Sequence, residues 1–219
     1  EAKLERVDHV FIVKPFRIAK YPVTNAQFDA FLNADDGYRN EEWWMDIDQS
    51  EDAITPSWQE VNAPRETVSW FEAVAFCQWL SYRLKSMVRL PAEWEWQQAA
   101  TDGDPRRKYP WEGGWDPARC NSAESGLRQV TPVGMYPQGA THHGVVDMAG
   151  NVWEWCLNTQ QKPEEPESAR IDKEGSKRVI RGGTWNNEPE FLRVSFRFGL
   201  NADTRLSSVG FRLAQDIKT

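Results

Sequence analysis

The chain has 219 residues, of which 40% are hydrophobic and 27% charged, and its formal net charge at pH 7 is −7. An acidic balance disfavours a surface that follows nucleic-acid phosphates, and no apolar run approaches the roughly 20 residues of a membrane-spanning helix. We therefore expect one folded domain over 1–219, with no direct nucleic-acid ligand and no membrane span.

Local signals predict the regular elements of the N-terminal half. Loose alternation from Val7 to Ile18 predicts a short pair of strands. Thr24 can cap one helix, Ser69 and Glu72 have the spacing of a capping box, and Pro91 suits the first turn of a third helix. The predicted helices are 25–32, Ser69 to about Lys85, and 92–100.

The stretch from 101 to Val179 is rich in Gly, Pro, Asn and Asp, and we expect irregular loops there. Its most polar part, Gln160 to Lys177, is predicted to be a mobile loop. Twelve Trp residues are expected to supply core that short elements cannot. Three Cys residues without paired spacing indicate reduced thiols and a cytoplasmic protein. The chain begins at Glu1 rather than Met, so this domain can be the C-terminal part of a longer protein.

The C-terminal segment combines a regular frame with chemically irregular positions. It reads RGGTWNN at 181–187 and VGFR at 209–212, with Arg193, Arg197, Asp203 and Arg205 between them. The intervening residues follow neither the period of a strand nor that of a helix.

This frame resembles the C-terminal segment of the formylglycine-generating-enzyme (sulfatase-modifying factor) family, and other blocks resemble that family in the same order. They read KYPVTNAQF at 20–28, VSWFEA at 68–73, RLPAEWEW at 89–96 and DMAGNVWEW at 147–155. The resemblance implies an α+β, C-type-lectin-like fold that is irregular and loop-rich, with two or three helices and short antiparallel strands.

The chain departs from the oxidases of this family at the two copper-binding cysteines, whose positions hold Asn187 and Leu192. An amide and an isobutyl group cannot replace thiolates as ligands of Cu(I). Related sulfoxide synthases use non-haem iron, but this chain has only His9, His142 and His143, and the last two are adjacent. We therefore predict no copper, no iron and no enzyme activity.

The resemblance also implies structural calcium. One site would use Asp147, Glu154 and the backbone carbonyls of Gly150 and Val152, because Ca²⁺ prefers six to eight oxygen ligands. A second would lie at Asn121 and Ser122. The alternative is that Asp147 and Glu154 only cap turns by hydrogen bonding.

Residues 181–213 further resemble the variable region of diversity-generating-retroelement proteins with this fold. In that family, adenine-directed mutagenesis of Asn codons yields residues such as Phe, Leu, Thr and Ser. Glu188 and Glu190 do not fit the scheme. The positions that do fit are Asn186, Asn187, Phe191, Phe196, Phe198, Leu200, Asn201, Thr204, Leu206, Ser207 and Ser208.

These observations predict a non-catalytic ligand-binding domain whose diversified surface recognises a variable protein partner. Five of the irregular residues are large and apolar, and in a display surface they would form an exposed patch. Two alternatives stay open. The five can instead be core residues of terminal strands, and the domain can be an oxidase or sulfoxide-synthase type, degenerate or using other residues around Trp153, Trp185 and Arg197.

Overall fold

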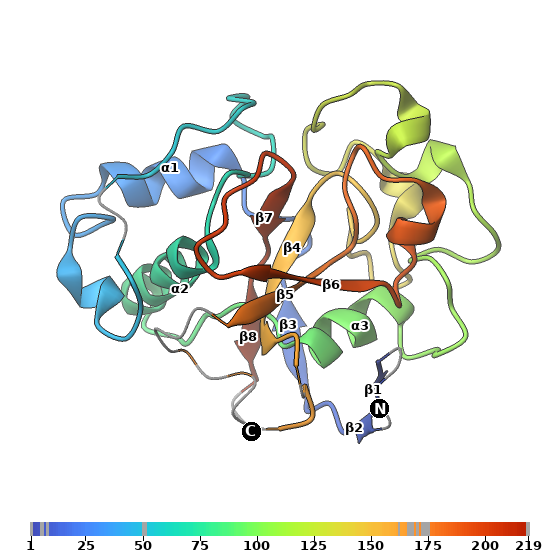
Figure 1. Ribbon diagram of the computed structural model, residues 1–219, viewed down its shortest axis with the longest axis horizontal. Coiled ribbons are helices and arrows are strands. Elements are labelled where there is room, and N and C mark those ends of the chain that lie inside the picture. The colour runs from blue at the N-terminus through green and yellow to red at the C-terminus, as the bar shows by residue number, and fades with distance from the viewer. Residues whose placement is uncertain are drawn as a thin grey trace.

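The computed structural model describes residues 2–4, 7, 9–49, 52–161, 163–165, 169, 171 and 176–217. Its fold class is α+β, as predicted, with long irregular connections between short elements (Figure 1). The α-helices are α1 (Asn25–Asn33), α2 (Trp70–Leu84) and α3 (Glu93–Thr101). The strands are β1 (Ala2–Lys3), β2 (Val10–Phe11), β3 (Phe16–Ile18), β4 (Trp153–Thr159), β5 (Lys177–Arg181), β6 (Arg197–Asn201), β7 (Val209–Phe211) and β8 (Ala214–Asp216). Short 3-10 helices lie in the connections: η1 (Glu41–Trp44), η2 (Pro117–Arg119), η3 (Ala123–Ser125), η4 (Pro137–Gly139) and η6 (Pro189–Leu192).

Two of the three helices begin where their capping signals predict. The Gln27 amide N–H donates to Thr24 Oγ1 at 3.4 Å, and the Gln27 side chain accepts from the Thr24 N–H at 2.9 Å. At α2 the Ser69 N–H donates to Glu72 at 2.7 Å and the Glu72 N–H donates to Ser69 Oγ at 3.1 Å. Both helices therefore start with a reciprocal capping box.

The start of α3 differs from the prediction. Pro91 lies before the helix instead of in its first turn, and Ala92 is the N-cap. Ala92 has no side-chain oxygen to offer, but Glu95 reaches back and accepts from the Ala92 N–H at 2.8 Å. One half of a capping box is thus enough to define this end of the helix.

A four-stranded sheet of order β6-β5-β4-β7 occupies the middle of the molecule (Figure 1). Its pairs are antiparallel except β4 and β7, which run parallel with Trp153 opposite Val209. The predicted strand pair over 7–18 is wrong in its pairing: β2 joins β1, whereas β3 joins β8 from the other end of the chain. A strand's partner is set by tertiary packing, which the alternation of one segment cannot show.

The core contains the largest side chains, as the Trp count predicts. Trp70, Trp96 and Trp155 are fully buried. Their indole N–H groups are satisfied: Trp70 donates to the Cys156 carbonyl and Trp155 to the Val68 carbonyl, each at 2.9 Å. A buried indole needs such a partner.

Two glycines, one in the frame and one in the block 147–155, are required because the backbone there approaches other atoms closely. Gly183 has φ of 74°, and a Cβ there would lie 2.4 Å from Leu192 Cδ2. Gly150 has φ of 79°, and its Cβ would lie 2.1 Å from the Asn121 carbonyl oxygen. Any other residue would strain the turn at either place.

The three cysteines lie in the interior of the fold. Cys77, Cys120 and Cys156 are buried and unpaired, and burial raises the pKa of the Cys120 thiol to about 12. Half of the residues of the predicted mobile loop from Gln160 to Lys177 fall outside the described residues. Among those described, no helix has the length and apolar character needed to cross a bilayer.

Candidate functional site

The irregular C-terminal segment runs along one edge of the central sheet. After β5 the chain turns through 182–187, forms η6, and returns as β6 (Figure 1). Strand β6 pairs only with β5, so it is an edge strand, with Phe198 opposite Ile180. Residues 202–208 then connect β6 to β7, which lies at the opposite edge of the sheet.

The structure places none of the eleven irregular positions in the fully buried interior. The apolar ones Phe191, Phe198 and Leu206 are 38%, 47% and 43% exposed. The exposed residues are Asn186, Phe191, Phe198, Asn201 and Leu206, and the half-buried ones are Asn187, Phe196, Leu200, Thr204, Ser207 and Ser208.

Other residues of the same segment, interleaved with these positions, have side chains buried in the interior. Leu192, Val194, Ala202, Val209 and Phe211 are each 0% exposed. Inward and outward side chains therefore alternate irregularly along one segment, because η6, an edge strand and a loop follow one another within about 20 residues.

Two of the five large apolar residues lie partly in the core, as the alternative interpretation expected. Phe196 and Leu200 are half-buried and pack against the main core. The Phe196 ring contacts the Phe191 ring edge-on, with centroids 5.1 Å apart, and lies 5.9 Å from Trp153. Phe191, Phe198 and Leu206 remain exposed.

Three buried glutamates hold the frame, and each comes from a different sequence block. Glu93, fully buried at the start of α3, pairs with both Arg181 and Arg197: Arg181 Nη1 lies 2.6 Å from Oε1, and Arg197 donates to both oxygens at 2.7 Å. Arg181 also donates to Gln97 and to the Val194 carbonyl. Strands β5 and β6 are thereby tied to α3.

The other two glutamates tie down the end of the segment. Arg205 donates to Glu72 Oε2 at 2.8 Å. Arg212 donates to both oxygens of Glu154 at 2.6 Å, and Trp96 Nε1 donates to the same carboxylate at 2.7 Å. Arginine can meet a carboxylate with two parallel hydrogen bonds in a fixed geometry, as Arg212 meets Glu154. Such a pair also fixes the direction from which the two side chains approach each other.

Burial and ion pairing act in opposite directions on Arg197. Desolvation, the largest single effect, would lower its pKa, but the hydrogen bonds to Glu93 and the charge of Glu93 together outweigh it and raise the pKa above the ordinary value of arginine. Removing one partner from such a pair leaves an uncompensated charge, which typically costs about 3–5 kcal/mol. The frame is therefore specified by charge pairs as well as by apolar packing.

One of the predicted calcium ligands, Glu154, is engaged by an arginine. Both oxygens of Glu154 accept from Arg212, so Glu154 has a different partner from the one expected. Asp147 is nearly buried and accepts from the Gly134 N–H at 2.7 Å. Burial raises the pKa of Asp147 to about 6, against the lowering effect of that hydrogen bond. Gly150 and Val152 are buried beside these residues.

The second predicted calcium loop is closed by its own hydrogen bonds. Asn121 Nδ2 donates to the Gln129 carbonyl at 2.8 Å, and its Oδ1 accepts from Ser125 at 2.9 Å. Ser122 Oγ is buried without a partner. Within the described part of the chain, no three His, Cys, Asp or Glu side chains form a cluster that could hold a metal ion. Calcium binding at the two predicted sites stays a prediction.

The two positions aligned with copper-binding cysteines differ in environment. Asn187 is half-buried, and its Oδ1 accepts from the Thr184 N–H at 3.1 Å. Leu192 is fully buried in a small cluster with Tyr109, Trp111 and Cys120. Asn187 thus stabilises a turn, and Leu192 is core.

Sequence reasoning missed the partners of the frame arginines. The signal was present, since Glu72, Glu93 and Glu154 each stand inside one of the recognised blocks, and the arginines recur through an otherwise irregular segment. Which glutamate meets which arginine depends on contacts up to 133 residues apart. Only the fold supplies that information.

Comparisons with known proteins place this geometry in a family. Residues 2–217 match the family described as Sulfatase-modifying factor enzyme 1-like domain. The chain is 33% identical to a hercynine oxygenase of Mycolicibacterium thermoresistibile over 97% of its own length but 53% of that protein. It is 30% identical to a formylglycine-generating enzyme of Streptomyces coelicolor, covering 95% of this chain and 80% of that one. It thus spans about half the length of the oxygenase it matches.

A solved structure shows the same fold. Treponema denticola variable protein 1 superimposes with a TM-score of 0.70 at 22% identity, covering 91% of this chain and 84% of that one. The predicted C-type-lectin-like fold of the formylglycine-generating type is thereby confirmed.

The prediction that the chain is not an enzyme is contradicted by these relatives. The hercynine oxygenase and the formylglycine-generating enzyme, both at least 30% identical across nearly the whole chain, are named as enzymes. The prediction relied on two cysteine positions and three histidines. Similarity over the whole scaffold outweighs that local argument.

Proposed function

The chain belongs to the Sulfatase-modifying factor enzyme 1-like domain family, and on that scaffold we propose that residues 186–208 form a diversified face that binds a variable protein partner. The proposal rests on one observation. Along this segment, the irregular residues differ in exposure from the scaffold residues that lie between them. The eleven irregular positions are exposed or half-buried, whereas Leu192, Val194 and Ala202 between them are buried, and Arg197 and Arg205 pair with buried glutamates. Exchange at the irregular positions can therefore change the surface while the scaffold persists.

The chemistry of the face favours a protein ligand. Phe191, Phe198 and Leu206 present large apolar surface, and such groups are common at the centres of protein interfaces. Glu188 and Glu190 are exposed on either side of Pro189 next to Phe191. A partner with an apolar centre and basic side chains at its rim would match this arrangement.

The first test is made on DNA. We expect a second, near-identical copy of the segment encoding 185–212 near the native coding region, beside a reverse-transcriptase gene. The two copies should differ only where the second has adenine. If no such copy exists in the native locus, the diversification part of the proposal fails.

The second test is made on protein. A display library randomised at the eleven positions should yield folded binders to unrelated proteins. A matched library randomised at the five buried residues Leu192, Val194, Ala202, Val209 and Phe211 should yield few folded members. Equal folding yields from the two libraries would contradict the separation of face and frame.

A second candidate function is an oxygenase- or oxidase-type activity, favoured by the names of the curated relatives. Its test is oxygen consumption by the full natural protein after loading with Fe(II) or Cu(I), with thiol and imidazole compounds as substrates. Metal-dependent turnover would support it, and its absence under both loadings would count against it. We also propose a cytoplasmic location, which the three buried, unpaired thiols support.

A further inference from the structure

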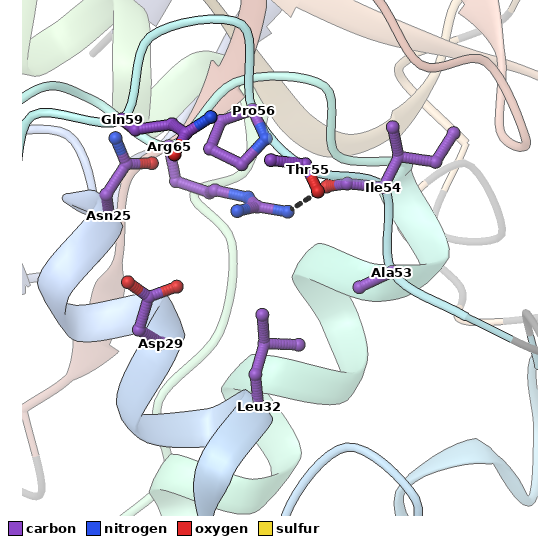
Figure 2. A pocket seen from close by; sticks show the side chains of 9 residues that line it. All are labelled: Asn25, Asp29, Leu32, Ala53, Ile54, Thr55, Pro56, Gln59 and Arg65. Atoms are coloured by element: carbon purple, nitrogen blue, oxygen red, sulfur yellow. Dashed lines mark hydrogen bonds between the residues drawn. The ribbon is translucent and has the colours of Figure 1, made fainter.

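A small pocket lies between α1 and the segment 53–59 (Figure 2). Its volume is about 230 Å³, below the roughly 300–1,000 Å³ of sites for drug-sized ligands. Its wall combines apolar side chains, among them Leu32, Ala53 and Pro56, with a few polar ones. None of its lining residues belongs to 186–208, so the pocket is independent of the proposed function.

The donor side of the pocket is a buried arginine. Arg65 is 1% exposed, and one terminal nitrogen donates to the Ile54 carbonyl at 2.5 Å. Its Nε is buried without a partner, and no carboxylate of the described residues forms an ion pair with it. The guanidinium carbon also lies 4.6 Å from the centre of the Phe28 ring. A buried cation without a paired anion is costly, so this side favours a negatively charged ligand group.

The acceptor side of the pocket lies on the first two turns of α1. Asn25 is buried, and its Nδ2 donates to the Trp58 and Glu60 carbonyls at 2.7 and 3.0 Å. Its Oδ1 is buried without a partner. The carboxylate of Asp29 points from the next turn toward the same space (Figure 2). An amide oxygen and a carboxylate side by side favour a cationic donor.

We infer that this pocket binds a small zwitterion, specifically an α-amino acid with a short apolar side chain. The ligand carboxylate would lie on the Arg65 guanidinium, and its ammonium would donate to Asp29 and to Asn25 Oδ1. The aliphatic part would contact Leu32 and Ala53. One ligand would then supply both an acceptor for the unpaired arginine nitrogen and a donor for the unpaired amide oxygen.

Size and charge together restrict the ligand class. A water molecule occupies about 30 Å³ in the liquid, so a pocket of about 230 Å³ has room for about eight heavy atoms, as many as valine has. A simple anion would leave Asn25 Oδ1 unpaired, and a simple cation would leave the Arg65 guanidinium without a directly bonded anion. Unpaired buried groups of either kind cost about 1–3 kcal/mol, so a ligand with both charges is favoured over either alone.

The test is titration calorimetry with valine and two analogues that each lack one charge. Isovalerate has no ammonium group, and isobutylamine has no carboxylate. We expect valine to bind, and each analogue to bind at least about tenfold more weakly, equivalent to about 1.4 kcal/mol. Isovalerate binding as tightly as valine would overturn the zwitterion assignment, and no detectable heat up to about 10 mM valine would overturn the site.

Variants separate the two halves of the pocket. Asp29→Asn should weaken valine binding about tenfold and leave isovalerate binding unchanged, while Asp35→Asn, an exposed change just beyond the same helix, should alter neither. Arg65→Lys should weaken valine binding, because lysine cannot present the side-on pair of donors. If that variant does not fold, Asp29→Asn alone decides: full-strength valine binding by Asp29→Asn would overturn the inference.

Discussion

Single replacements of phenylalanine by alanine in the C-terminal segment should lower the free energy of unfolding by amounts that depend strongly on the position. Phe191 and Phe198 are 38% and 47% exposed, whereas Phe211 is 0% exposed in the same segment. The substitution is chemically identical at all three positions. Differences in the free energy of unfolding therefore report how far each ring takes part in the core.

The expected sizes follow from the buried areas. A phenylalanine side chain has on the order of 150 Å² of surface, so Phe191 and Phe198 bury about 80–90 Å² each. At about 25 cal/mol per Å² that is about 2 kcal/mol, and partial burial in the unfolded chain lowers it to about 1.5 kcal/mol. Phe211→Ala also leaves a cavity and should cost about 3–5 kcal/mol.

Urea unfolding followed by tryptophan fluorescence measures these differences in free energy, and thermal unfolding followed by the same signal measures the melting temperature. Phe211→Ala should lower the melting temperature by about 6–20 °C, and the two exposed positions by about 3–6 °C each. Phe196, half-buried against Trp153, should fall between the two classes. If Phe191→Ala and Phe198→Ala cost as much as Phe211→Ala, these rings belong to the core and the proposed binding face is wrong.

Three further predictions test the frame and the titratable groups. Glu93→Gln removes the charge that compensates Arg181 and Arg197, so the free energy of unfolding should fall by about 3–5 kcal/mol; a loss below about 1 kcal/mol would contradict the role of these pairs. Because burial raises the pKa of Asp147 to about 6, the protonated form is favoured in the folded state, and the associated stability is present below about pH 4 and lost as pH rises through 6. In calcium-free buffer, Asp147→Asn should therefore stabilise the protein by about 3 kcal/mol at pH 7.5 but not at pH 4, and equal effects in urea titrations at both pH values would refute this. Burial raises the pKa of Cys77, Cys120 and Cys156, so a thiol-specific chromogenic reagent at pH 8 should label them only as the protein unfolds, whereas fast labelling of the native protein would show an accessible thiol.

The sequence predicts those parts of the fold that depend on near neighbours. The starts of α1 and α2 follow from Thr24 with Gln27 and from Ser69 with Glu72, because a capping box closes within three residues. The pairing of β3 with β8 joins residues about 200 positions apart, and alternation within one strand contains no information about a partner so distant. Local signals therefore locate elements, while their pairing requires the whole fold.

The same distinction applies to the candidate site. Irregular side-chain chemistry indicated which positions of 186–208 face outward, and the structure leaves all of them at least partly exposed. Irregularity could not show that Phe196 lies against Trp153, because that contact joins β4 to the loop before β6. Nor could it reveal the Arg65 pocket, since Arg65 and Asn25 come from separate segments and only Asn25 stands in a recognised block.

The ion pairs explain how one segment can combine a fixed path with exchangeable side chains. An apolar core alone tolerates small shifts along a strand, because hydrophobic contacts are not directional. Arg181, Arg197, Arg205 and Arg212 each meet a buried carboxylate with directional hydrogen bonds, so the segment is fixed at four points whatever lies between them. The irregular residues contribute no partner to any of these pairs. A change at Phe198 or Leu206 therefore alters the surface without releasing the frame, whereas a change at Glu93 releases two strands at once.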